Sequence, residues 1–310
     1  DRLLGVVTDG DVRRGLMKGL SLSDSVSDIL NSSPATVSVK APQGAIMDVF
    51  RRTKVKQLVV IDDDRVVHGI VSLEEILLPP LRTSPVLLMA GGKGRRLLPL
   101  TKDCPKPLLC VGDRPLLETI MDGLIREGFC DFFISVNYKK EMIKEHFGDG
   151  SSRGVSIRYL EEDEPLGTAG ALGLLPDSIS QPVIVMNGDV LTGLSVGSLL
   201  DYHRNFSPSL TLCVREYEVT VPYGVVESDN GMVSTIREKP SFRYSVNAGI
   251  YVVDPGVVSE VQSGAYLDMT DLIQMTLTKG MEIRTFQVED YWIDIGHLDD
   301  YERANREFGD

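Results

Sequence analysis

A glycine-rich loop that follows a short apolar run is the first feature of the sequence that could do chemistry. The loop reads Ala90-Gly91-Gly92-Lys93-Gly94-Arg95-Arg96. Three glycines in four positions let the backbone approach a polyphosphate and aim its N–H groups at it, and the basic side chains add positive charge. Taken alone, the loop also fits a plain turn or a dinucleotide-binding loop. A phosphate-binding P-loop is excluded, because the Gly-Lys-Ser/Thr ending is missing.

A lysine and an aspartate further along the chain could also handle phosphates. Lys106 stands between Pro105 and Pro107. Because prolines restrict the backbone, its ammonium group is delivered from a stiff loop. Asp189 ends the apolar run 183–188. The carboxyl ends of strands in an open parallel sheet line the ligand crevice, and Mg²⁺ prefers oxygen ligands. The sequence therefore predicts that Asp189 binds Mg²⁺ or Mn²⁺.

Apolar strands and at least one amphipathic helix must position these residues. Segments 86–89, 132–136 and 183–189 read as apolar strands, and 115–125 reads as a helix with a proline at an early position. Three prolines within 79–85 exclude a helix or a central strand there. We therefore expect a small module over residues 1–78, a proline-rich linker over 79–85 and a second domain over 86–310.

Composition and charge limit the possible functions. The 310 residues are 42% hydrophobic and 25% charged, which excludes a disordered chain. Residues 1–82 are neutral, so the formal net charge of −13 belongs to the rest, and that part is a poor match to a long nucleic acid. The four cysteines lack metal-type spacing, so we expect free thiols in a reducing cytoplasm. We expect no membrane segment, because no apolar run approaches about 18 residues.

The N-terminal module contains a weak internal repeat. Segment 4–12 resembles segment 68–76, and each reads as a strand, then a hydroxyl residue, then an acid three positions further on. The hydroxyl could simply cap a helix and the acid favour its positive end. The repeat resembles a cystathionine-β-synthase (CBS) domain pair whose first half is incomplete. That resemblance implies an adenine-nucleotide site and a possible homodimer through this module. The residues implied as its ligands are Thr8, Asp11, Ser72 and Glu75.

The second domain resembles the sugar-phosphate nucleotidyltransferases. The resemblance depends on the order of the glycine loop, Arg-Leu-X-Pro-Leu-Thr at 96–101, Pro-Lys-Pro at 105–107 and the helix at 115–125. One departure is Arg95, where the family commonly has Thr. The expected fold class is α/β: a Rossmann-like nucleotidyltransferase domain with a mixed, mostly parallel sheet, preceded by a small α/β CBS-type module.

The resemblance also implies roles for particular residues. It makes Arg96, Lys106 and Asp189 catalytic, and it makes Asp294 the partner of Asp189 in binding the metal. The residues implied for nucleotide binding are Ala90, Gly91, Gly92, Lys93, Gly94, Arg95, Gly167, Thr168 and Ala169. Those implied for sugar binding are Gly224, Glu238, Lys239, Asn247 and Gly249.

The implied reaction joins an NTP and a sugar 1-phosphate into a nucleotide-sugar and pyrophosphate. The run Pro-Leu-Gly-Thr-Ala-Gly at 165–170 resembles guanylyltransferases, so GTP is the expected nucleotide, with Glu162 or Glu164 accepting from the guanine donors. The segment 167–171 also fits a tightly packed helix start. Open alternatives are a uridylyl- or thymidylyltransferase, a catalytically inactive regulatory subunit that binds a nucleotide-sugar, and an adenylate-sensing module.

Overall fold

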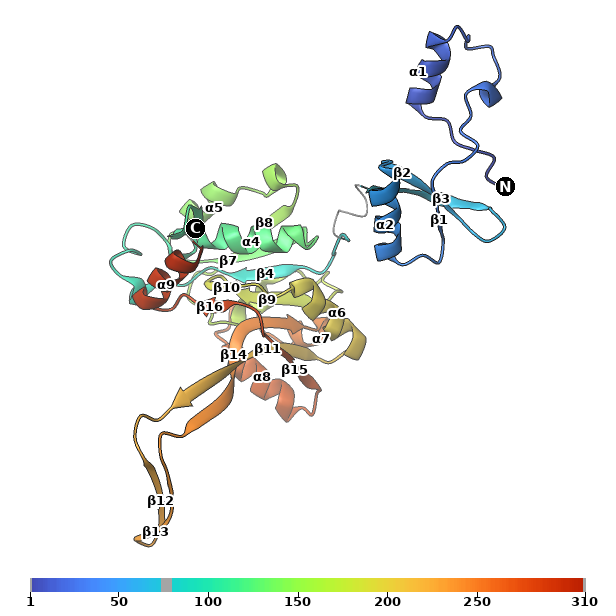
Figure 1. Ribbon diagram of the computed structural model, residues 1–310. Coiled ribbons are helices and arrows are strands. Elements are labelled where there is room, and N and C mark those ends of the chain that lie inside the picture. The colour runs from blue at the N-terminus through green and yellow to red at the C-terminus, as the bar shows by residue number, and fades with distance from the viewer. Residues whose placement is uncertain (1, 74–79, 309–310) are drawn as a thin grey trace. The chain divides into compact units, whose positions relative to one another are not determined.

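The chain divides into two units in the computed structural model, which describes residues 2–73 and 80–308. The units are Asp1–Pro80 and Leu81–Asp310 (Figure 1). Their boundary lies within the proline-rich segment 79–85. All four cysteines are free thiols. In the described ranges, no helix is both long enough and apolar enough to cross a bilayer.

Unit 1 is a small α/β module. Its strands form a sheet in the order β1-β2-β3, in which β1 pairs parallel and β3 antiparallel with β2. Val37, Phe50 and Leu58 form its core. The elements are α1 (Asp9–Met17), η1 (Val26–Asp28), β1 (Thr36–Ser38), α2 (Gln43–Thr53), β2 (Gln57–Ile61) and β3 (Val67–Ser72).

Unit 2 is built around a seven-stranded sheet in the order β15-β11-β14-β9-β4-β7-β8. Four neighbouring pairs are parallel, and β14 is antiparallel to both β9 and β11. The mixed, mostly parallel sheet confirms the predicted fold class. Its strands are β4 (Val86–Met89), β7 (Asp131–Val136), β8 (Ser156–Glu161), β9 (Val183–Asn187), β11 (Leu210–Thr220), β14 (Ser241–Val253) and β15 (Ile283–Gln287).

Shorter strands and helices complete unit 2. The short strands are β5 (Cys110–Val111), β6 (Arg114–Pro115), β10 (Val190–Thr192), β12 (Val225–Asp229), β13 (Met232–Arg237) and β16 (Trp292–Asp294). The α-helices are α4 (Leu116–Arg126), α5 (Lys140–Phe147), α6 (Val196–Phe206), α7 (Pro255–Val258), α8 (Met269–Thr278) and α9 (Leu298–Phe308). The 3₁₀ helices are η2 (Arg95–Leu97), η3 (Lys106–Leu108), η4 (Ser151–Arg153) and η5 (Gly170–Leu174).

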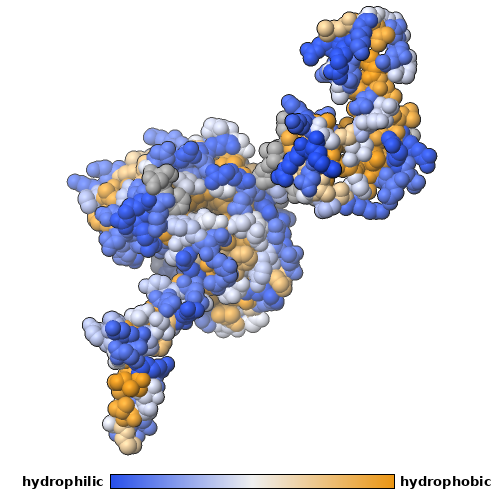
Figure 2. All heavy atoms as spheres, viewed as in Figure 1, coloured by the Kyte–Doolittle hydropathy of each residue, from blue (hydrophilic) through white to orange (hydrophobic). Residues whose placement is uncertain are grey.

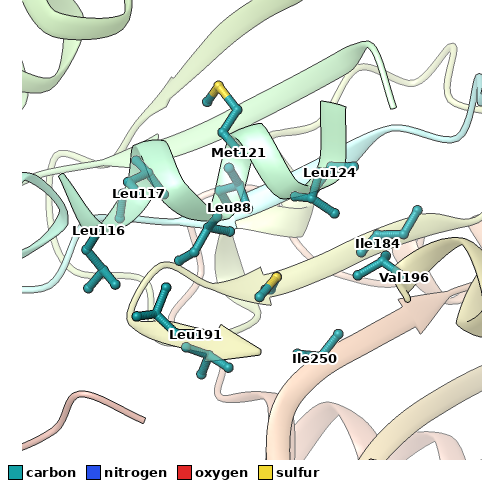
Figure 3. Packing of buried hydrophobic residues seen from close by; sticks show 14 of the residues in the cluster. Leu88, Leu116, Leu117, Met121, Leu124, Ile184, Leu191, Val196 and Ile250 are labelled. Carbon is teal, nitrogen blue, oxygen red and sulfur yellow. The ribbon is translucent and has the colours of Figure 1, made fainter. Parts of the chain in front are cut away.

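Two apolar layers hold the sheet from both sides. Successive residues of a strand point to opposite faces. Leu88 and Ile184 therefore join the layer that contains α4, which Figure 3 shows with Met121 and Leu124. Leu87 and Val185 join the opposite layer, together with Met269 and Leu272 of α8. Burial on both faces fixes β4 and β9, and with them the loops at their carboxyl ends.

Strands β11 and β14 extend beyond the sheet and form an arm. β15 pairs with β11 only at 210–214, and β9 pairs with β14 only at 250–253. The remaining parts of β11 and β14 pair with each other alone, and beyond them β12 and β13 form an antiparallel hairpin. We call residues 215–246 the arm. Figure 1 shows it projecting from the body of unit 2.

Candidate active site

A pocket of about 360 Å³ lies at the carboxyl ends of β4 and β9. It gathers residues that are far apart in the sequence: most of the glycine loop, the lysine between the two prolines, and both aspartates. The residues that line it are Gly92, Lys93, Gly94, Arg95, Arg96, Leu97, Lys106, Asp189, Asp294 and Gly296.

A short strand pair brings the two aspartates together. β10 and β16 are antiparallel, and Val190 lies opposite Asp294 in their register. The N–H of Ile295 donates to the backbone oxygen of Asp189 over 3.0 Å. Asp189 itself lies between β9 and β10, so one carboxylate follows a central strand and the other ends β16. Backbone hydrogen bonds therefore fix the spacing of the two carboxylates.

The pocket contains opposed charges in close contact. The Nζ of Lys106 donates to Oδ2 of Asp189. Loss of surrounding water raises the pKa of Asp294, and the negative charge of Asp189 raises it further, while Lys106 and Arg96 act in the opposite direction. Two carboxylates that repel each other in a partly desolvated site provide a natural position for a cation.

The glycine loop has the shape and charge needed to hold an anion. Gly94 has a φ of +60°, and a Cβ there would lie 2.7 Å from Cγ2 of Thr101. The hydroxyl of Thr101 donates to the backbone oxygen of Gly94 over 2.8 Å, which ties the loop down. Lys93, Arg95 and Arg96 form no ion pair with any described residue. Their positive charges therefore remain available to phosphate oxygens.

A buried carboxylate lies under the start of the loop. Glu162 is buried, its Oε1 accepts from the hydroxyl of Ser135, and its Oε2 accepts from the N–H of Leu166 over 3.0 Å. A Cβ on Gly91 would lie 3.5 Å from both of these oxygens. Gly91 therefore lies directly beside both oxygens of this carboxylate, at the distance of an ordinary van der Waals contact. Glu164, the other acid predicted to accept from guanine, is exposed.

Packing against the chain itself explains the small residues at 167–170. Gly167 has a φ of +77°, and a Cβ there would lie 2.6 Å from the backbone oxygen of Leu267. The backbone N–H and the hydroxyl of Thr168 donate to Oδ1 of Asp268 over 3.1 and 3.2 Å. Ala169 is buried. Thr168 stays exposed, so contact between this segment and a base remains a prediction.

The structure divides the predicted sugar-binding residues into two groups. Asn247 and Gly249 lie in the body: Oδ1 of Asn247 accepts from the N–H of Gly249, and Gly249 fits against the side chain of Asn187. Gly224 and Glu238 lie at the base of the hairpin, where a Cβ on Gly224 would be 3.0 Å from Oε2 of Glu238, and Lys239 follows with a φ of +44°. Lys239 and Glu238 are eight and nine residues before Asn247, which is roughly 26–30 Å along an extended strand.

The implied ligand residues of unit 1 have structural partners of their own. The hydroxyl of Thr8 donates to Oδ2 of Asp11 over 2.6 Å, and both side chains cap α1. These hydrogen bonds, together with Arg14, lower the pKa of Asp11 to about 2. Ser72 ends β3, and Glu75 lies outside the described residues. An adenine nucleotide at this unit remains a prediction.

Several residues that support the site are not predicted by the sequence analysis. Thr101 and Ser135 fix the glycine loop and Glu162, and Asp268 fixes Thr168. The hydroxyl of Tyr251 accepts from Nδ2 of Asn247 over 2.7 Å. Asp268 is 100 positions from its partner, so no local signal could reveal it. Ser135, as the one polar residue inside an apolar strand, was the available signal.

Comparison with known proteins identifies the family. Residues 85–310 match the nucleotidyl transferase family and residues 26–78 match the CBS domain. The chain therefore belongs to the nucleotidyl transferase family and carries a CBS domain, as the resemblance predicts.

Individual relatives and structures are similar to the same part of the chain. A mannose-1-phosphate guanyltransferase from Debaryomyces hansenii is 30% identical over 227 residues, 69% of this chain and 62% of its own length. A UTP–glucose-1-phosphate uridylyltransferase from Synechocystis is 30% identical over 240 residues, 71% of this chain and 62% of its own. The chain thus spans less than two thirds of these relatives. The structure of a candidate glucose-1-phosphate thymidylyltransferase from Bacillus anthracis has a TM-score of 0.59 and 27% identity, covering 73% of this chain and 96% of that one.

Proposed function

We propose that unit 2 transfers a nucleoside monophosphate from an NTP to a sugar 1-phosphate. The observation that supports this most strongly is the single pocket that holds a cationic glycine loop, Lys106 and two adjacent carboxylates. An oxygen of the sugar 1-phosphate forms a bond to the α-phosphorus of the NTP. The bond from that phosphorus to the bridging oxygen breaks, and pyrophosphate leaves with the electron pair. The products are a nucleotide-sugar and pyrophosphate.

The chain has to supply position and charge rather than a nucleophile. The attacking phosphate oxygen is already ionised at neutral pH, so no general base is needed. Arg96 and the loop N–H groups neutralise the triphosphate. Lys106 holds the sugar phosphate next to the α-phosphate of the NTP. Before these substrates bind, the ion pair with Asp189 keeps the ammonium group of Lys106 in the pocket. Catalysis then depends on approximation and charge neutralisation.

Asp189 and Asp294 fit a divalent metal ion. The described residues contain no cluster of three or more His, Cys, Asp or Glu side chains that could enclose an ion. Two carboxylates suit Mg²⁺, which typically takes its other ligands from water and substrate phosphates. When bound there, the ion would neutralise charge on the α-phosphate oxygens. Asp189 would then share its charge with the metal, which frees Lys106 for phosphate.

The base that we propose is guanine. Its N1–H and N2–H are neighbouring donors, and a carboxylate with two oxygens can accept from both. Glu162 uses one interaction on each oxygen for Ser135 and Leu166, so each oxygen keeps a second lone pair, and Gly91 lies beside both oxygens. Uracil and thymine offer one ring N–H, and adenine and cytosine offer only an amino group on that edge. The relatives include both guanyl- and uridylyltransferases, so their names favour neither base. The choice of guanine is supported by the hydrogen-bonding chemistry of Glu162.

Assays of pyrophosphate release test both the nucleotidyl transfer and the choice of guanine. GTP, UTP, dTTP, CTP and ATP would each be assayed with mannose 1-phosphate and glucosamine 1-phosphate. We expect a kcat/KM for GTP that exceeds the others by about 10⁴ in a favourable case. Glu162→Gln should reduce this preference, while Glu164→Gln, an exposed neighbour, should leave it unchanged. A preference for UTP or dTTP would remove guanine alone. Nucleotide-sugar binding without any turnover would favour an inactive regulatory subunit.

A further inference from the structure

Two residues that follow β7 contact the chain between the glycine loop and the lysine of the Pro-Lys-Pro motif. We call residues 94–106, which join these two features, the connector. β4 and β7 are parallel neighbours, so the chain leaves both strands at the same edge of the sheet. The Nζ of Lys139 donates to the backbone oxygen of Lys102 over 2.7 Å, and the hydroxyl of Tyr138 donates to the same oxygen over 3.3 Å. The segment after β7 therefore holds the connector near its middle.

The middle of the connector has few other ties to the protein. Its flanks are anchored by packing, since Leu97 is buried in the apolar layer of α4 and Pro105 is buried as well. Between them, most of 98–103 is exposed. Among the described residues, the hydrogen bonds that reach 98–103 from outside the connector come from Tyr138 and Lys139 alone. The order of this stretch therefore depends on these two side chains.

The backbone conformation of Lys139 is unusual for a lysine. Its φ is +51°, in the left-handed region that glycine and asparagine occupy at the least cost. Lys139 is also the N-cap of α5, a position that favours Ser, Thr, Asp or Asn, and its side chain makes no capping hydrogen bond. Backbone strain of this kind is concentrated at functional sites. The reason for a lysine at this position therefore lies in what its side chain contacts.

The ammonium group of Lys139 differs from that of its neighbour in the partner that it has. The surface of α5 is largely hydrophilic in Figure 2, and Lys140 pairs there with the carboxylate of Glu161 over 2.6 Å. Lys139 is half-buried and forms no ion pair with a described residue. Its charge is directed to the carbonyl of Lys102 and lies 5.6 Å from the centre of the Tyr138 ring. A hydrogen bond from a charged donor is roughly twice as strong as a neutral one, so this contact is a firm tether.

We propose that Lys139 is a positioning residue whose ammonium group holds the connector, so that Arg96 and Lys106 keep their places around the substrate phosphates. The inference rests on the proposed nucleotidyl transfer, which assigns these two cations to the triphosphate and the sugar phosphate. Lys139 acts through the connector and touches no substrate itself. A displacement of about 1 Å in a positioning contact can reduce a rate about 10²-fold, so a single tether on a segment that carries both cations matters for both substrates.

Hydrogen exchange of the full chain without substrate tests the tether directly. Lys139→Met removes the donor and keeps the length of the side chain, whereas Lys140→Met makes the same change at the next residue, where only an exposed ion pair is lost. We expect amide exchange in the connector to rise about 10-fold in Lys139→Met, the effect of losing one hydrogen bond from a charged group. Lys140→Met should exchange like the wild type. Lys139→Arg, which keeps a donor, should restore protection.

Assays of pyrophosphate release connect the tether to the reaction. In Lys139→Met we expect kcat/KM to fall about 10-fold for the NTP and for the sugar 1-phosphate alike, because the connector carries a cation for each. Lys139→Arg should recover most of this loss, and Lys140→Met should match the wild type. Lys139→Gly removes the tether together with the left-handed strain. It should melt at or above the temperature of Lys139→Met and still be as slow, which separates positioning from stability.

Three outcomes would overturn the proposal. Unchanged exchange in the connector of a folded Lys139→Met would mean that the contact with Lys102 holds nothing. Faster exchange with an unchanged kcat/KM would mean that the reaction does not depend on the order of the connector. A Lys139→Arg variant as slow as Lys139→Met would mean that a charged donor is not what matters. A wild type without any turnover would refute the proposed function instead, and the exchange measurement would still decide whether Lys139 holds the connector.

Discussion

The family resemblance connects two regions of unit 2 with substrate: the cluster of Lys106, Asp189 and Asp294, and the arm. The fold supports the residues of these two regions to different degrees. Asp189 follows the buried strand β9, and Asp294 ends β16, which is held by its pairing with β10. Lys106 begins η3 and is ion-paired with Asp189. Gly224, Glu238 and Lys239 lie in the arm, at the base of the β12–β13 hairpin, where no third strand pairs with it. The cluster is assembled before substrate arrives, whereas the arm residues are presented from a part that packs against nothing in the described chain.

The difference has an energetic consequence. Groups fixed before the reaction do not have to be ordered when the transition state forms, so their electrostatic effect is large. Groups on a mobile or unsupported element lose conformational freedom when they bind, and part of their interaction energy is spent on that ordering. Substitutions in the cluster should therefore reduce kcat strongly, and substitutions on the arm should act mainly on KM for the sugar 1-phosphate.

The largest effect is expected for Asp189→Asn. This variant removes the carboxylate that contacts Lys106 and that we assign to the metal, so pyrophosphate release should fall to background. Its melting temperature should be unchanged or higher, because one of two adjacent negative charges is gone. Asp177→Asn, at an exposed surface position, is the control and should retain full turnover. Undiminished turnover in Asp189→Asn would remove the metal assignment.

Lys106→Ala should reduce kcat by about 10²–10³, as is typical when one preorganised donor to the developing charge is lost. The fall should appear with every sugar 1-phosphate, since the contact is to phosphate and not to sugar. The matched control is Lys279→Ala, which removes a lysine that pairs with Glu260 away from the pocket. A change confined to KM for the NTP would mean that Lys106 binds the triphosphate without acting on the transition state.

Much of the cluster could be predicted from the sequence, because its members have local signals. Glycines and cations in one loop, a lysine between prolines and an aspartate after an apolar strand each indicate their chemistry from neighbouring residues. The small residues at 167–170 illustrate the opposite case. Their type is explained by a backbone segment about 100 positions away, which no local pattern contains. The separation of the sugar-binding residues into two groups could not be predicted either. It depends on where β11 and β14 stop pairing with other strands, and the tertiary structure decides that.

A smaller effect is expected on the arm itself. Lys239→Ala should raise KM for the sugar 1-phosphate by about 10-fold, the loss of one hydrogen bond from a charged group, with little change in kcat. Arg243→Ala removes a cation from the charged face of the same arm and should leave KM unaltered. If Lys239→Ala reduced kcat as strongly as Lys106→Ala does, the contrast between arm and cluster would be wrong.

The smallest expected effect is a stability change in Asp294→Asn. The pKa of Asp294 is raised by desolvation and by Asp189, with a smaller contribution from Asp300, and is lowered by Lys106 and Arg96. Above that raised pKa the carboxylate is ionised in both the folded and the unfolded chain, and the folded state suffers the full repulsion. The variant should therefore melt about 2 °C or more above the wild type near neutral pH. As the pH falls through the raised pKa, the folded wild type takes up a proton first, and the difference shrinks. It vanishes below about pH 3.9, where both states are protonated.

Calorimetry across this range, with the exposed Asp290→Asn as the control, measures the effect. A gain that persists unchanged at low pH would mean that packing, and not the charge of Asp189, is its cause, and the cluster would then lack the charge repulsion that makes it a cation site.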